Sequence, residues 1–273
     1  MIHRKKTGSI VCPSCGKLIS ANSKECYYCG RKNPGLWGYG PELQKLFGNF
    51  SEATPILVGA CVVLYVISLL IDPAALFRPH GLFNILSPSM KALDNIGMTG
   101  TYALAHGRWW TLVTAIYLHG GLLHILFNML WLYQLGHMVE NLFGRSRTFL
   151  IFTISGVLGF FVSDMLGIMF TIGASGSIFG LLGALVYYGR KRGGFFGRQI
   201  YTQIGTWAIV LFLFGFMMPG VNNFAHAGGF VGGYISAQLL GFHEISRETE
   251  THRMLALAAV ILTVISFVLE FVM

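Results

Sequence analysis

The sequence is short of charged residues. Only 11% of its 273 residues are Asp, Glu, Lys or Arg, whereas 54% are hydrophobic, and the mean hydropathy is +0.62. Water-soluble domains carry about 25% charged residues. The shortage of charge therefore excludes an ordinary soluble domain and is typical of an integral membrane protein.

Other features are missing as well. The chain has no low-complexity tract and no internal repeat of about 20 to 50 residues. Its first fifty residues contain no apolar stretch long enough for the core of a cleavable signal peptide, so we expect none. Glycine, in contrast, is abundant at 35 residues, and small residues allow membrane helices to approach one another closely.

Four of the five cysteines lie in the polar, basic segment 1–34, as Cys12-Pro-Ser-Cys15 and Cys26-Tyr-Tyr-Cys29. Two C-x-x-C pairs, each followed by glycine, can place four thiolates around one Zn²⁺. The segment resembles small zinc-ribbon domains, and it predicts a structural Zn²⁺ held by these four cysteines. A redox or disulfide pair of motifs is the alternative, which a cytosolic location would disfavour.

The rest of the chain is predicted to be all-α and membrane-embedded. We interpret residues 35–53 as a linker or a short interfacial helix, because aromatic and leucine side chains are interspersed among polar groups there. Crossing a bilayer takes about 20 apolar residues. Seven segments meet this need approximately: 54–71, 116–137, 148–168, 174–189, 201–218, 224–241 and 254–272.

The positions of the basic residues predict an orientation. With the amino terminus inside, sixteen of the 19 Lys and Arg residues fall on the inner side, and only Arg78, Lys91 and Arg108 fall outside. This asymmetry favours a cytoplasmic amino terminus and an outer carboxyl terminus. The net charge of +8 then suits an anionic inner leaflet and requires no nucleic acid partner.

Gly173-Ala174-Ser175-Gly176 stands where an apolar segment begins again after a short break. A serine among small residues could be a nucleophile or only a notch for helix packing. Two further polar residues, His124 and Asn128, are four positions apart and share one helix face in the second predicted span, which also holds His119. Each of them alone is more simply explained by hydrogen bonds between helices.

A third histidine, His226, lies on the sixth predicted span. Gly229 and Gly233 follow it at three and seven residues, so all three lie on one stripe. A comparable strip begins next to Ser175, with Gly176, Gly180 and Gly183. Two such strips predict backbone-to-backbone packing, which would bring Ser175 Oγ within hydrogen-bond reach of a His226 nitrogen.

Together these motifs resemble those of the rhomboid family of intramembrane serine proteases. The matches are Gly173 to Gly176 for the family's G-x-S-G, His124 and Asn128 for its H-x-x-x-N, and Ala225, His226, Gly229 and Gly233 for its A-H-x-x-G-x-x-x-G. Their order, spacing and depth agree over residues 54–241. The resemblance implies a rhomboid-like core of six transmembrane helices, followed by an inner loop and a seventh helix within residues 242–273.

The resemblance also implies roles for individual residues. Ser175 would be the nucleophile and His226 the general base, without a third carboxylate and without a cofactor for catalysis. His124, Asn128 and the Ser175 backbone N–H would stabilise the oxyanion. Phe179 matches an aromatic position that packs against the catalytic histidine. One departure is that Trp110 is followed by Thr111 where the family often has arginine.

The expected activity is hydrolysis of peptide bonds in or next to transmembrane segments of other membrane proteins. The alternative is a catalytically silent rhomboid-like adaptor or quality-control protein that binds membrane clients. A transporter would need intramembrane charges or broken helices in related halves, which we do not find convincingly. The expected surroundings are the lipid bilayer of a prokaryotic plasma membrane, with an organelle as the alternative, and a cytosolic partner of the zinc ribbon stays open.

Overall fold

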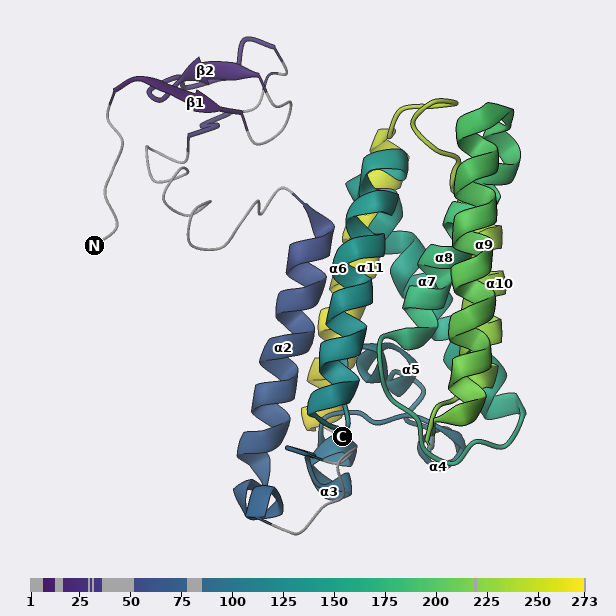
Figure 1. Ribbon diagram of the computed structural model, residues 1–273. Helices are drawn as coiled ribbons and strands as arrows, with labels where there is room; N and C mark the ends of the chain where they lie inside the picture. The colour runs from purple at the N-terminus through teal and green to yellow at the C-terminus, as the bar shows by residue number, and fades with distance from the viewer. Residues whose placement is uncertain are drawn as a thin grey trace. The chain divides into compact units, whose positions relative to one another are not determined.

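The structure is a computed structural model (Figure 1). It describes residues 7–12, 17–28, 30, 32–35, 52–77, 85–218 and 220–272. The chain divides into two compact units, Met1–Ile56 and Leu57–Met273, and each is described by itself. Most of the predicted linker lies outside the described residues.

A two-stranded antiparallel sheet forms the centre of the first unit. Strand β1 (Ser9–Val11) pairs with β2 (Leu18–Ser20), with Ile10 opposite Ile19. Because residues directly opposite each other in an antiparallel pair share a face of the sheet, both isoleucines point to the same side. There they form a small buried cluster with Cys12, Ala21 and Cys26.

The cysteines of the first unit are only partly visible. Cys12 and Cys26 are each 1% exposed and lie in one cluster, whereas Cys15 and Cys29 fall outside the described residues. Within the part of the chain that the structure describes, no group of three or more His, Cys, Asp or Glu side chains could hold a metal ion. The four-cysteine zinc site therefore stays a prediction.

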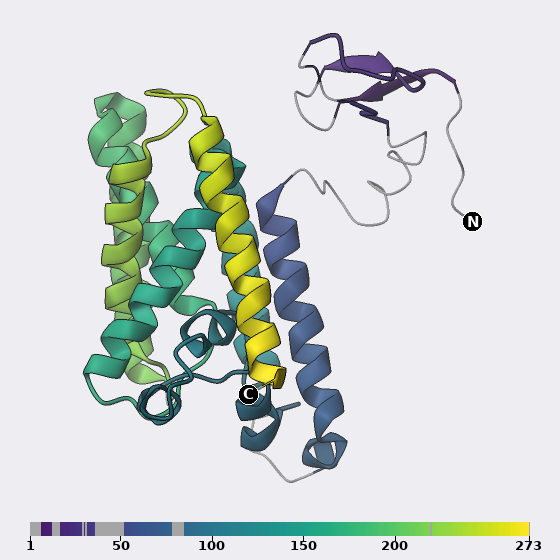
Figure 2. The ribbon, with the colours of Figure 1, turned by 180° about the vertical axis from the view of Figure 1, so that it is seen from behind.

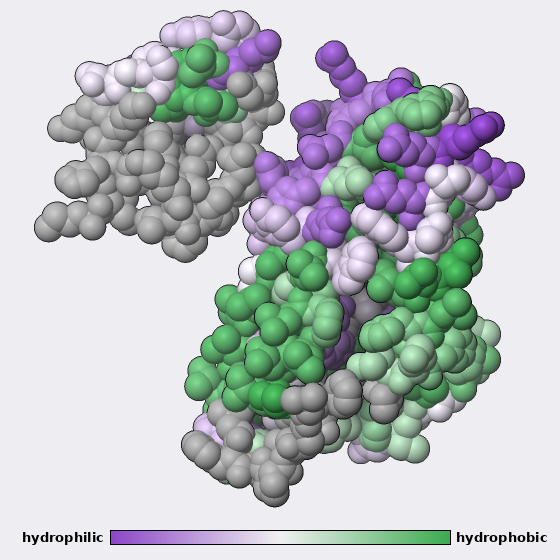
Figure 3. All heavy atoms as spheres, viewed as in Figure 1, coloured by the Kyte–Doolittle hydropathy of each residue, from purple (hydrophilic) through white to green (hydrophobic). Residues whose placement is uncertain are grey.

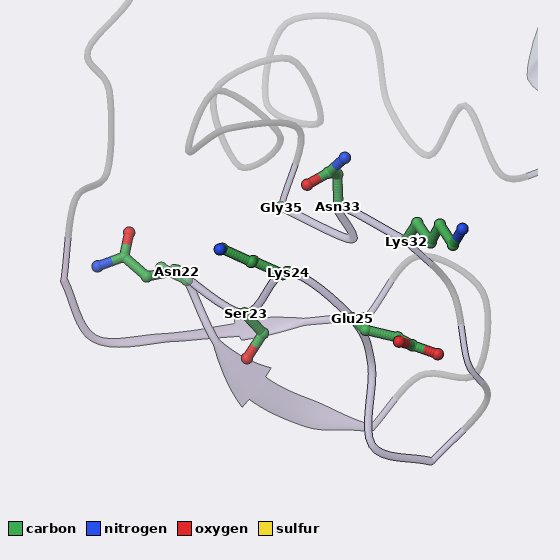
Figure 4. Close-up of a pocket in the computed structure, with 8 residues that line it drawn as sticks. Asn22, Ser23, Lys24, Glu25, Lys32, Asn33 and Gly35 are labelled. Atoms are coloured by element: carbon green, nitrogen blue, oxygen red, sulfur yellow. The ribbon is translucent and has the colours of Figure 1, made fainter.

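A pocket of about 510 Å³ lies beside the same cluster (Figure 4). It is lined by Ala21, Asn22, Ser23, Lys24, Glu25, Lys32, Asn33 and Gly35. An isolated antiparallel bridge joins the backbones of Glu25 and Lys32. The lining contains both acidic and basic side chains. None of the residues expected to carry catalysis lies here.

The remaining described residues are mostly helical (Figures 1 and 2). Short elements connect the long helices: η2 (Pro73–Phe77), α3 (Met90–Asn95), α4 (Thr101–Ala105), α5 (Thr111–Thr114) and η4 (Ala115–Tyr117). The long helices are α2 (Ala53–Ile71), α6 (Leu122–Phe143), α7 (Arg145–Met165), α8 (Ser175–Arg192), α9 (Gly194–Met217), α10 (Asn223–Leu240) and α11 (Glu250–Val272).

A long helix thus lies in each of the seven predicted segments. Among the described residues, five of these helices are long and apolar enough to cross a membrane, namely α2, α6, α7, α9 and α11. Helices α8 and α10 are not among these five, and both are rich in glycine. The mostly helical, multi-pass fold is supported, whereas a crossing by all seven helices stays a prediction.

The start of the second long helix was predicted wrongly. We expected the helix to begin at residue 116, but α6 begins at Leu122 and continues to Phe143. The preceding residues form the short η4 turn, Leu118 is extended, and two glycines follow, which weaken any helix through them. His119 therefore precedes the helix and does not lie within it.

Helix α8 lies at the centre of the helical unit, where it packs against α6, α7, α9 and α10. Its glycines face the glycines of α10. A Cβ atom at Gly229 would overlap the carbonyl oxygen of Gly176, and one at Gly233 would overlap that of Gly180. We call this backbone contact between α8 and α10 the glycine seam. The two helix backbones can approach this closely because glycine has no side chain.

The outer surface of the helical unit is divided along the helices (Figure 3). On the face seen there, apolar side chains cover most of the length of the bundle, and hydrophilic ones gather at one end. The exposed apolar residues include Leu130 and Tyr133 on α6 and Leu213 on α9. Exposed Arg190 and Lys191 lie at the carboxyl end of α8. This distribution suits a protein embedded in a bilayer.

Helix α11 runs along the outside of the bundle (Figure 2) and is held at both ends. Near its carboxyl end the Glu270 carboxylate accepts hydrogen bonds from the Arg108 guanidinium and from Trp110 Nε1, the latter at 2.8 Å. Before its amino end, Glu248 accepts from the backbone N–H groups of Ser146 and Arg147, at 2.7 and 3.1 Å. The second contact caps α7, because the first N–H groups of a helix lack partners within it.

Candidate active site

Ser175 is the first residue of α8 and is half-buried. The chain reaches it through Gly173, whose φ of +120° is accessible to glycine and strained for other residues. The Gly173 N–H donates to the Ala115 carbonyl oxygen at 2.9 Å, which fixes this turn. The first N–H groups of α8 have no partner within the helix, and they can stabilise negative charge beside Ser175.

His226 lies in the second turn of α10 and is only 6% exposed. Its imidazole stacks on the Phe179 ring, with centroids 4.3 Å apart and planes inclined by 14°. Phe179 is one turn beyond Ser175, so both residues lie on the same face of α8. Gly176 meets the backbone just before His226, since a Cβ there would lie 3.4 Å from the Ala225 carbonyl oxygen.

The serine and the histidine are therefore neighbours across the glycine seam. Among the hydrogen bonds of the described residues, none joins Ser175 Oγ to His226. A catalytic dyad of Ser175 and His226 therefore stays a prediction. The His226 Nδ1 atom instead lies 3.1 Å from Asn223 Oδ1 in the preceding turn. The opposite ring nitrogen, Nε2, has no hydrogen-bond partner among the described residues.

His124 approaches the same place from the first turn of α6. Its Nδ1 accepts a hydrogen bond from the Gly120 backbone N–H at 3.2 Å, so the ring hydrogen is on Nε2. This Nε2 faces the serine turn, because a Cβ at Gly173 would lie 2.7 Å from it. His124 thus presents a donor to the segment immediately before Ser175.

Asn128 lies one turn further along α6 and is buried. Its Nδ2 donates to the His124 carbonyl oxygen at 2.8 Å, while its Oδ1 has no partner among the described residues. His119 packs edge-on against the His124 ring at 5.1 Å, and its buried Nε2 has no hydrogen-bond partner in the part of the chain that the structure describes. Buried polar atoms without a partner are unusual, and a catalytic role is one of the explanations for them.

Asn222 holds the start of α10 in place, a role that we did not predict. Its Oδ1 accepts from the Ala225 N–H at 3.1 Å, and its Nδ2 donates to the Oγ atoms of Ser163 and Thr171. Asparagine is a preferred residue immediately before a helix, which is the signal in the sequence. The cap joins α10 to the end of α7 and to the segment before α8.

The carboxylate of Glu270 is buried near the carboxyl end of α11, with a side chain 4% exposed. Arg108 also donates to Asp94 Oδ1 at 2.8 Å. Burial alone would lower the pKa of Arg108, but the hydrogen bonds that its guanidinium donates to Asp94 and Glu270 raise this pKa above its ordinary value. A lone acid near the end of an apolar helix is the only signal for this contact in the sequence.

Known proteins share the region that contains these residues. The Rhomboid domain matches residues 106–243. Rhomboid protease GluP of Bacillus subtilis (strain 168) is 37% identical over 155 residues, which are 57% of this chain and 31% of that protein. RHOMBOID-like protein 5 of Arabidopsis thaliana is 35% identical over 172 residues, which are 61% of this chain and 54% of that protein.

A shorter relative is covered more fully. YdcA of Bacillus subtilis (strain 168) is 33% identical over 135 residues, which are 48% of this chain and 67% of that protein. The chain covers less than two thirds of GluP and of RHOMBOID-like protein 5. The matched domain includes His124, Asn128, Ser175 and His226 and makes up just over half of the chain. The chain belongs to the rhomboid family.

Proposed function

We propose that this chain is an intramembrane serine endopeptidase that hydrolyses peptide bonds in or next to transmembrane segments of other membrane proteins. The observation that carries the proposal is the stacking of His226 on Phe179, one turn from Ser175. A nearly buried imidazole that stacks one helical turn away from a serine at a helix start supports nucleophilic catalysis by this pair. The family membership and the name of GluP support the same activity.

In the proposed reaction Ser175 Oγ attacks the carbonyl carbon of the scissile bond, and His226 Nε2 takes the hydroxyl proton. The tetrahedral intermediate then collapses, the C–N bond breaks, and the imidazolium returns the proton to the leaving amine. Water attacks the acyl-enzyme in the second half, again with His226 as base. The acid product leaves and the Ser175 hydroxyl is restored.

The developing oxyanion would be bound by His124 Nε2–H and by the backbone N–H of Ser175. Asn128 would contribute the second hydrogen of its Nδ2 group, since only one is used within α6. Losing one such donor costs about 3 kcal/mol of barrier. We therefore expect His124→Ala and Asn128→Ala each to lower kcat by about 100-fold.

A substrate helix must unwind before it can be cleaved, because its amides are hydrogen-bonded internally in the membrane. We expect glycine or other helix-weakening residues near the cleavage site. Replacing them with leucines in a candidate segment should slow cleavage, and an unchanged rate would refute the unwinding requirement. We propose that the amino terminus is cytoplasmic and the carboxyl terminus outside, in a prokaryotic plasma membrane.

The first unit is proposed to be a zinc ribbon. Two of its four proposed ligands, Cys12 and Cys26, are buried together, which fits a shared metal. Cys15 and Cys29 would complete the tetrahedron, and such a closed zinc would stabilise the fold without joining the reaction. A cytosolic partner for this unit belongs to the same proposal.

Cleavage of a model transmembrane substrate in proteoliposomes tests the activity, using the wild type, Ser175→Ala and His226→Ala. We expect cleavage by the wild type alone. Equal cleavage by all three would exclude the dyad. If none of the three cleaves while the wild type still binds the substrate, the chain is the silent adaptor.

A further inference from the structure

We propose that Asn223 is a positioning residue, which holds His226 in the tautomer that can act as a base. The inference rests on the proposed function and concerns how the base is prepared. It does not make Asn223 a catalytic residue, because its contact is with the imidazole.

The contact between the two side chains fixes the direction of the hydrogen bond. His226 Nδ1 lies 3.1 Å from Asn223 Oδ1, three residues earlier on the same face of α10. An amide oxygen can only accept, so Nδ1 must carry the hydrogen. The other nitrogen, Nε2, then has a free lone pair, as a base for the Ser175 hydroxyl requires.

The stacking on Phe179 cannot provide this selection. Stacking fixes the plane of the imidazole, but both neutral tautomers stack equally well on an aromatic ring. A Ser-His-Asp triad uses a carboxylate to hold the histidine tautomer. No carboxylate contacts His226 among the described residues, so the amide of Asn223 is the group in position to take over this part of the task.

The amide is itself held from a neighbouring helix. Gly215 of α9 is buried, and a Cβ there would overlap Asn223 Oδ1 and lie 3.1 Å from its Cγ. The bare backbone of α9 thus makes room for the amide and limits its rotation. On the other side, the cap formed by Asn222 ties the first turn of α10 to Ser163 and Thr171.

The two adjacent asparagines therefore have different tasks. Asn222 bonds to backbone and hydroxyl groups, and its loss should lower stability. Asn223 bonds to His226, and its loss should lower the rate of proton transfer. This difference makes the proposal testable, because a structural role and a positioning role change different quantities.

The deciding comparison is between Asn223→Leu, which has similar size and no acceptor, and Asn223→Asp, which can only accept. In proteoliposomes we expect Asn223→Leu to lower kcat about tenfold or more with KM changed less than about threefold, since proton transfer is affected and binding is not. Asn223→Asp should keep kcat within about threefold of the wild type. Gln238→Leu, the same kind of change at an exposed position of α10, should leave kcat unchanged.

Gly215→Ala provides a second route if Asn223→Leu does not fold. The new methyl group displaces the Asn223 amide, so kcat should fall while the thermal unfolding midpoint shows a folded protein. Added to Asn223→Asp, the same methyl group should lower kcat again, because the acceptor is displaced. If Asn223→Leu does fold, adding Gly215→Ala to it should lower kcat no further, because the acceptor is already absent. Wild-type kcat in Asn223→Leu or in Gly215→Ala would overturn the proposal, as would equal losses in Asn223→Leu and Asn223→Asp.

Labelling of the serine by a fluorophosphonate probe separates this proposal from the proposed function. If the wild type and Ser175→Ala are labelled equally, the proposed nucleophile is wrong. If Ser175→Ala loses all labelling but Asn223→Leu is labelled at the wild-type rate, only the role of Asn223 is wrong. Slow labelling of Asn223→Leu, together with wild-type labelling of Gln238→Leu, supports both.

Discussion

The glycine seam and the additional helix α11 both pack against α7, but they are held in opposite ways. In the seam, backbone touches backbone, and a single added methyl group would overlap a carbonyl oxygen. Helix α11 has one buried residue, Ser266, among its described positions and depends on polar contacts at its ends. A contact without side chains has no rotamers to adjust, so the seam can hold Ser175 and His226 in register.

The difference has a functional meaning. The proposed reaction needs two side chains on different helices to stay within hydrogen-bond reach, and an error of about 1 Å can cost about 100-fold in rate. The seam places this requirement on a contact between bare backbones, which has no side-chain rotamers to adjust. Helix α11 needs no such accuracy, because its Glu270 contacts Arg108 and Trp110, outside the proposed dyad.

The largest effect is expected from Gly229→Ala, which breaks the seam. The added Cβ would overlap the Gly176 carbonyl oxygen and push α10 away from α8. We expect kcat to fall about 100-fold and the free energy of unfolding to fall by about 1–3 kcal/mol. Substrate cleavage and thermal unfolding of the purified variant measure both changes.

Gly205→Ala is the matched control, since nothing lies within 4 Å of a Cβ at that position of α9. Alanine is favoured over glycine in a helix, so this variant should be as stable as the wild type or up to about 1 kcal/mol more stable. If Gly229→Ala behaved like Gly205→Ala, the seam would not be the contact that holds Ser175 and His226 in register.

An intermediate effect is expected from Glu270→Gln, which weakens the hold on α11. The amide keeps the size of the carboxylate but removes the charge that faces Arg108, so we expect a loss of about 1–2 kcal/mol in the free energy of unfolding. Cleavage should fall less than in Gly229→Ala, because the dyad stays in register. Equal losses of activity in the two variants would contradict the division between seam and helix.

Glu250→Gln is the control on the same helix. Glu250 pairs with Arg253 at 2.6 Å, but the two side chains are 81% and 59% exposed. An exposed ion pair contributes about 0–1 kcal/mol, and less in high salt. The contrast between the two glutamates should therefore persist at high ionic strength, where exposed pairs are screened.

Several of these features could be predicted from the sequence for a physical reason. Apolar segments of membrane length predict helices, and glycines at helical spacing predict a close contact between helices. The seam between α8 and α10 was therefore expected. The pairing of Ser175 with His226 followed from the same spacing and stays a prediction. Local pattern was sufficient here because each signal repeats along one helix.

Other features depend on contacts between distant segments, which no local pattern contains. The bond from Asn223 to His226 depends on which way an amide is turned, and Gly215 of α9 limits that choice. The burial of Glu270 depends on Arg108, which is 162 residues away. The start of α6 was misplaced because apolar residues before Leu122 extend the hydrophobic run without extending the helix.

The smallest effect, which should depend on pH, is expected where the loop before α11 meets α8. Glu244 accepts hydrogen bonds from Tyr188 Oη and from Arg192 Nε, at 2.8 and 2.9 Å. These hydrogen bonds lower the pKa of Glu244 below its ordinary value of 4.5, and the bond from Tyr188 has the larger effect. A carboxyl group with a lowered folded-state pKa stabilises the protein above its unfolded pKa, and this contribution is lost as the pH falls through the folded pKa. Glu244→Gln should therefore be slightly less stable than the wild type at neutral pH. The difference between the two unfolding midpoints should shrink as the pH falls below 4.5, and a difference that grew on acidification would show that the charge of Glu244 is not what holds this loop.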